Sequence, residues 1–140
     1  MLEFEVFSVK VRLYFGFFAV LMLYLYIGGR TGALVEAALV CCLLHELGHL
    51  TAMFLFGCLP RRVSFYAGGI RITPRGMNRL SRTAGAVILS AGCLVNLLLA
   101  GASWLAGLEG IVRINLGLAA FNLLPLPWLD GGRLLALLRN

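Results

Sequence analysis

Long apolar stretches separated by short polar segments are the main pattern along this chain of 140 residues. The pattern predicts four membrane-spanning helices, at about residues 13–27, 33–56, 84–105 and 111–124. The fourth stretch is short for a bilayer and Pro125 and Pro127 follow it, so we expect its end to lie inside the membrane. A last apolar stretch, 134–138, is too short to span.

A second pattern, alternation of apolar and polar residues, indicates strands between the second and third apolar stretches. It predicts an interfacial β-hairpin at about residues 60–74, with its turn near Gly68 and Gly69. Residues 7–12 alternate in the same way, so a small sheet is expected. Two interpretations of the hairpin are open: an anchor whose apolar face lies on lipid, or a sheet edge that binds an extended substrate segment. In the second, the binding positions are Gly68, Gly69, Ile70 and Ile72.

Composition supports a membrane protein. The chain is 61% hydrophobic and only 13% charged, and a soluble core of this size could not hide so much apolar surface. We therefore predict a single domain over residues 1–140, an all-α membrane protein with about four transmembrane helices and a small β-hairpin or sheet on the cytosolic side. Glu3 and Glu5 and the lack of a small-residue cleavage site argue against a cleaved signal peptide, so the first span is expected to remain.

The net charge of +6 does not indicate nucleic acid, because the basic residues are not spread over a surface. Half of the twelve lie in one short segment between apolar stretches: Arg61, Arg62, Arg71, Arg75, Arg79 and Arg82. Placing this segment and both termini in the cytosol leaves only Arg30 and Arg113 outside, which is the arrangement typical of membrane proteins. Anionic lipid head groups are the expected counter-charge.

The second apolar stretch contains His45 and His49, four residues apart and therefore on one face of a helix. Two imidazoles at this spacing can bind one metal ion, and the intervening Glu46 can take a proton from water beside that ion. A charged side chain in the middle of a membrane helix costs about 2.5–3.5 kcal/mol, so such residues indicate function. The alternative is two core histidines that share this spacing by chance.

A third ligand can be sought by elimination. The chain has no other histidine, and no acidic residue lies between His49 and Glu109. Glu109 is expected at the outer face, whereas Asp130 follows the fourth span at its inner end, at the depth of the histidines. Asp130 is therefore the favoured ligand, and Cys58 and Cys93 are weaker candidates.

Two further sets of residues are expected to serve mainly packing. Small residues in the third stretch let helices approach closely: Gly85, Ala86, Ser90, Ala91, Gly92, Ala100 and Gly101. Asn115 and Asn122 share one helix face, for hydrogen bonding between helices or for orienting Asp130 or a substrate backbone.

Three segments resemble, in order, the motifs of the site-2 protease family of intramembrane zinc metalloproteases. They are residues 45–49 (HELGH), 90–96 (SAGCLVN) and 121–133 (FNLLPLPWLDGGR). The resemblance covers about two-thirds of the chain and is closest to the compact sporulation factor IVFB branch. One departure is Trp128, where relatives often carry proline or a small residue.

The resemblance implies one Zn²⁺ ion held by His45, His49 and Asp130, with Glu46 as the base. It implies that Asn96 helps to hold the substrate or the oxyanion, and that the hairpin at Gly68 and Gly69 corresponds to the family's membrane-associated strands.

We therefore expect an integral, multi-pass zinc endopeptidase of a bacterial cell membrane, with both termini and the mouth of the active site on the cytosolic side. Its expected partners are a membrane-embedded protein substrate and the lipid bilayer, with a regulatory membrane protein or a second copy as further candidates, and no nucleic acid. Cleavage in or near a transmembrane segment could release a regulatory factor. The alternatives are a non-catalytic membrane protein with a structural metal site, and a zinc or iron transporter.

Overall fold

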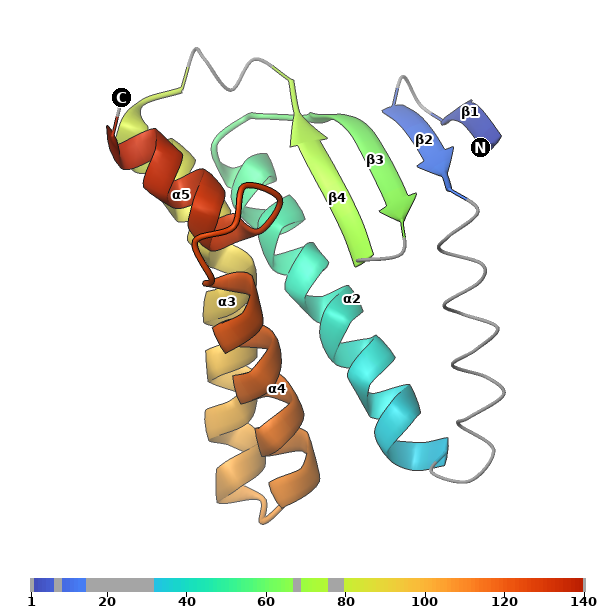
Figure 1. The fold of residues 1–140 in the computed structure, drawn as a ribbon, viewed down its shortest axis with the longest axis vertical. Helices are drawn as coiled ribbons and strands as arrows, with labels where there is room; N and C mark the ends of the chain where they lie inside the picture. Colours follow the sequence, from blue (N-terminus) through green and yellow to red (C-terminus); the bar gives the residue numbers. More distant parts are fainter. Residues whose placement is uncertain (1, 7–8, 15–31, 67–68, 76–79, 140) are drawn as a thin grey trace.

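The computed structural model describes residues 2–6, 9–14, 32–66, 69–75 and 80–139. These residues form a group of helices with a four-stranded sheet beside one end of it (Figure 1). The predicted first span, residues 13–27, lies outside the described residues apart from Leu13, which ends a strand.

Three helices coincide with the predicted spans to within two residues at each end. They are α2 (Gly32–Leu55), α3 (Arg82–Leu105) and α4 (Glu109–Asn122). Within the described residues, α2 and α3 are long and apolar enough to cross a membrane. The 14 residues of α4 extend for only about 21 Å, less than the hydrocarbon thickness of about 30 Å.

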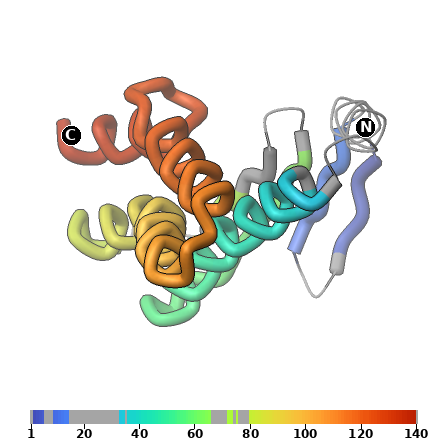
Figure 2. Tube along the Cα trace, turned by 90° about the horizontal axis from the view of Figure 1, so that it is seen from below, coloured from blue at the N-terminus to red at the C-terminus, as the bar shows by residue number. Residues whose placement is uncertain are grey.

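A further helix, α5 (Asp130–Arg139), was not predicted. Its ten residues follow the turn after α4, and it packs against α3 (Figure 1). Viewed from below, α2, α3 and α4 lie side by side, and β1 and β2 lie on the opposite side of α2 from α5 (Figure 2).

Many large apolar side chains of these helices face outward. Phe54 on α2 is 76% exposed and Trp104 on α3 is 72% exposed, and Leu43, Leu98 and Phe121 are exposed as well. An apolar surface of this extent is unusual for a protein in water and suits hydrocarbon. Together with the two long apolar helices, it indicates a membrane protein.

The strands are β1 (Leu2–Val6), β2 (Val9–Leu13), β3 (Pro60–Tyr66) and β4 (Gly69–Pro74), in the order β1-β2-β3-β4. The pairs β1–β2 and β3–β4 are antiparallel, and β2 runs parallel to β3. The predicted hairpin is therefore present, and the described part of the predicted segment 7–12, residues 9–12, belongs to the same sheet in β2, while residues 7–8 lie outside the described residues. Strand β1 was not predicted. Gly69 pairs with Tyr66, and Gly68 lies outside the described residues.

The apolar face of the hairpin packs on the helices. Val63 and Ile72 are cross-strand partners, and Ile72 is buried in a cluster with Ala52 and Met53 of α2, Ile88 of α3, and Cys58 in the segment between α2 and β3. The prediction that this face lies on lipid is therefore wrong at Ile72. An alternating pattern identifies an apolar face but does not distinguish lipid from apolar helices, because both are hydrocarbon surfaces. The contact holds β4 against the end of α2 that carries His49.

The two ends of the helices carry different elements. The sheet and α5 lie at one end of the helices, and the α3–α4 turn and the start of α2 lie at the other (Figure 1). The arginines of β3 and β4 thus share one end with β1 and α5, the first and last described elements, which agrees with the distribution of charge. The assignment of that end to the cytosol stays a prediction.

Candidate metal centre

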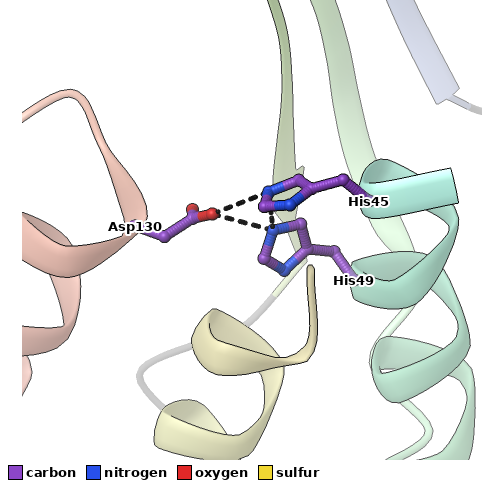
Figure 3. Close-up of side chains that lie close together, drawn as sticks. All are labelled: His45, His49 and Asp130. Carbon is purple, nitrogen blue, oxygen red and sulfur yellow. Dashed lines mark hydrogen bonds and ion pairs between the residues drawn. The ribbon is translucent and has the colours of Figure 1, made fainter. Parts of the chain in front are cut away.

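Helix α2 presents His45 and His49 on its face toward α3 and α5, one turn apart. Both are buried, with exposed fractions of 4% and 6%, and their rings meet edge to face with centroids 4.8 Å apart. Asp130, the first residue of α5, points toward both rings (Figure 3). The structure thus brings Asp130 of α5 next to His49 and His45 of α2, which precede it by 81 and 85 positions in the chain.

The three ligand atoms form a nearly equilateral triangle. Oδ2 of Asp130 is 3.1 Å from Nε2 of His45 and 2.9 Å from Nε2 of His49, and the two Nε2 atoms are 3.1 Å apart. Ligands of a tetrahedral zinc ion, bound at about 2.0–2.1 Å, are separated by about 3.3–3.4 Å. The triangle therefore accepts a divalent ion after small side-chain movements, and two imidazoles with one carboxylate are a donor set that suits zinc.

The ring orientation of His49 is fixed by its backbone contact. Nδ1 lies 2.7 Å from the carbonyl oxygen of Ile88. Because a carbonyl only accepts, Nδ1 donates the proton, and Nε2 keeps a lone pair directed at the centre. The corresponding Nδ1 of His45 is buried and has no hydrogen-bond partner among the described residues.

The carboxyl group of Asp130 also has a basic neighbour on its own helix. While Oδ2 faces the histidines, Oδ1 lies 3.8 Å from Nη1 of Arg133, one turn further along α5. An ionised carboxylate is the form that binds a metal ion.

Two glycines after Asp130 allow the chain to reach this position. A Cβ on Gly131 would overlap the carbonyl oxygen of Leu123, and a Cβ on Gly132 would overlap that of Leu126. The turn after α4 therefore lies directly against the first turn of α5. This close packing directs Asp130 at α2, and it explains the need for both glycines in physical terms.

Gly92 is a functional residue that sequence reasoning missed. A Cβ at this position would lie 2.5 Å from Nε2 of His49 and 2.6 Å from Nε2 of His45. Gly92 therefore keeps open the space around the two ligand atoms, although the sequence assigned it to packing alone. Its place within the segment 90–96 was the signal that could have identified it. Gly48 serves packing, since a Cβ there would meet Val95 and the backbone of α3 at Ala91.

The two cysteines considered as ligands lie elsewhere. Sγ of Cys58 donates to the carbonyl of Arg75 at 3.2 Å, and Sγ of Cys93 lies 3.9 Å from the carbonyl of Ala119. Neither belongs to the group of potential ligands found in the described part of the chain.

The other predicted site residues occupy three different settings. Glu46 follows His45 on α2, is partly exposed and does not belong to the ligand group. Asn96 on α3 is completely buried, and neither of its polar side-chain atoms has a hydrogen-bond partner among the described residues. Gly69, Ile70 and Ile72 belong to β4, at one edge of the described sheet. Substrate contact by these residues stays a prediction.

Comparisons with known proteins give one type of match. Neither protein-family models nor curated proteins match the chain. Among solved structures, it is similar to the site-2 protease from Methanocaldococcus jannaschii, with a TM-score of 0.74 and 21% sequence identity, over 96% of this chain and 69% of that one. The likeness does not distinguish branches, so similarity to the IVFB branch stays a prediction. It does establish the architecture: the chain has the fold of a site-2 protease.

Proposed function

We propose that this protein is an intramembrane zinc metalloprotease that hydrolyses peptide bonds in or near a transmembrane segment of a membrane-embedded protein. The observation that carries the proposal is the convergence of two Nε2 atoms and one carboxylate oxygen within 3.1 Å of one another, from α2 and α5. The similarity in fold to a site-2 protease supports the same assignment.

The roles of the residues follow from their chemistry. His45, His49 and Asp130 would hold the ion, and the negative charge of Asp130 offsets part of the charge of the ion in a site of low dielectric constant. Bound zinc would polarise the scissile carbonyl and lower the pKa of water. Glu46 would accept the proton of the attacking water and transfer it to the leaving amine nitrogen.

Substrate binding requires that a helical segment unwind, because a helix encloses its peptide bonds. Unwinding frees backbone groups that must find partners in an apolar setting. Strand β4 pairs only with β3 among the described strands, and it packs against α2, the helix that carries His45 and His49. We propose that an unwound substrate segment pairs with the other edge of β4. Ile72 contributes through its backbone only, since its side chain is buried.

The direct test is Glu46→Gln, which keeps the size of the side chain but removes the base. The purified variant should fold and bind one zinc ion per chain, while cleavage of a membrane substrate falls by at least about 100-fold, within the range expected for a general base. Glu36→Gln is the matched control, because Glu36 is an exposed glutamate on the same helix. Cleavage by Glu46→Gln at the wild-type rate would favour a structural metal site instead.

A further inference from the structure

A buried polar layer lies one helical turn from the histidines, on the side away from the sheet. We define this layer as Cys41 on α2, Asn96 on α3 and Asn115 on α4, all of which are buried. Nδ2 of Asn115 donates to Sγ of Cys41 at 3.2 Å and to the carbonyl of Ile111 at 3.0 Å. The layer therefore joins α2 to α4 directly.

The pairing of α2 with α3 places Asn96 in the same layer. Two contacts set the register of these antiparallel helices: His49 with Ile88, and His45 with Gly92. In this antiparallel pair, moving four residues toward the N-terminus of α2 corresponds to moving four residues toward the C-terminus of α3. Continued by one step, this register places Asn96 of α3 at the level of Cys41 of α2, which accepts a hydrogen bond from Asn115.

Four buried polar atoms in this region have no hydrogen-bond partner among the described residues. They are Nδ2 and Oδ1 of Asn96, Oδ1 of Asn115 and Nδ1 of His45. Unpaired buried polar atoms are rare because each carries a desolvation cost, and internal water is their commonest partner. Their concentration within one turn of the metal ligands points to a shared partner.

The two histidines differ in how their rings are held. A metal-bound imidazole usually donates its second N–H to a carbonyl, a carboxylate or water, which fixes the ring. His49 has such an acceptor in Ile88, and His45 has none among the described residues. Two unpaired amide oxygens belong to the polar layer, one helical turn away, and Cβ atoms one turn apart on a helix are separated by about 5–6 Å. One water molecule bridges a gap of this size.

We propose that Asn96 and Asn115 bind an internal water molecule that accepts a hydrogen bond from Nδ1 of His45. The water would donate to the amide oxygens and so hold the ring with Nε2 directed at Asp130. Both asparagines are then positioning residues for the metal ligand. The proposal rests on the proposed function, because it assumes that His45 binds the ion.

The test compares Asn96→Val with Asn96→Thr, two side chains of the same shape that differ by one hydroxyl group. Zinc affinity is measured by competition with a chelator, and the visible spectrum of the Co²⁺-loaded protein reports ligand geometry. Asn96→Val should weaken zinc binding about 10–100-fold, the usual effect of losing a group that orients a ligand, and should alter the Co²⁺ spectrum. Asn96→Thr should recover most of the affinity. Ser90→Ala is the control and should change neither, because the Ser90 hydroxyl donates within its own helix.

The possible outcomes separate the roles of Asn96. Equal zinc affinity and identical Co²⁺ spectra for Asn96→Val, Asn96→Thr and wild type would overturn the proposal. If only cleavage were lost, Asn96 would be a substrate contact, which also overturns it. If the Asn96 variants do not fold, the same pair at Asn115 decides by the same criteria. Failure of the wild-type protein to bind zinc would instead reject the metal site itself.

Discussion

At the residue scale, the candidate ligands could be predicted because ionisable groups are scarce in this chain. With two histidines, and no acidic residue between His49 and Glu109, elimination left few candidates for the third ligand. The structure places Asp130 beside both histidines. The role of Gly92 does not follow from its residue type, since the function of a glycine depends on what a side chain at its position would have met; only its place within the segment 90–96 pointed to the site.

Gly92→Ala should therefore abolish or strongly weaken zinc binding, because its methyl group would overlap the ligand nitrogens of both histidines. Alanine is favoured over glycine in a helix by about 1 kcal/mol, so loss of helix propensity cannot cause the effect. The measurement is zinc per chain in the purified protein. Gly101→Ala is the control, since the space around Gly101 on the same helix is open. Wild-type zinc content in Gly92→Ala would show that the ligands can move aside.

At the element scale, apolar length and alternation predicted three helices and the hairpin, because each is a local property of the chain. Strand β1 and helix α5 were missed. Pairing of β1 with β2 and packing of α5 on α3 stabilise segments whose own sequences carry a weak signal. The same limit applies to the apolar face of the hairpin. The alternating pattern identifies this face, but it does not show whether the face contacts lipid or other helices.

The edge role of β4 can be tested with Ile70→Pro and Arg71→Pro. Successive N–H groups of a strand point to opposite edges, so one substitution removes a bond to β3 and the other removes a donor from the outer edge. We expect one variant to fold and bind zinc, yet to cleave about two- to tenfold more slowly, as the loss of one backbone hydrogen bond predicts. Ile70→Val and Arg71→Lys keep both N–H groups as controls. A folded variant that cleaves at the wild-type rate would make the hairpin an anchor only.

At the scale of the whole molecule, the distribution of basic residues in the sequence and the arrangement of the elements in the structure distinguish the same end of the helices. The structure places the sheet, with the arginines of β3 and β4, and α5 at one end of the helices (Figure 1). The sequence could predict this because membrane insertion depends on charge differences across short loops. How α5 returns Asp130 to α2 could not be predicted, since it depends on the turn after α4 and on Gly131 and Gly132.

Labelling of single cysteines in a variant without the four natural cysteines tests this polarity. Arg75→Cys, after β4, should resist a membrane-impermeant reagent in intact cells and react in inverted vesicles. Ala106→Cys, in the α3–α4 turn, should behave in the opposite way. Both positions are exposed, so burial cannot account for a difference. Reaction of Arg75→Cys from outside the cell would reverse the orientation, and zinc content serves as the check that each variant is folded.

The distance along the chain between the ligands has a consequence for biosynthesis. Asp130 follows His49 by 81 residues, with α3 and α4 between them. At translation rates of about 5–20 residues per second, the nascent chain carries the histidine pair for about 4–16 s before the carboxylate is made. During that interval two neutral imidazoles alone would bind an ion weakly. The three-residue centre can therefore assemble only after α3 and α4, which lie between its ligands in the chain, have been made.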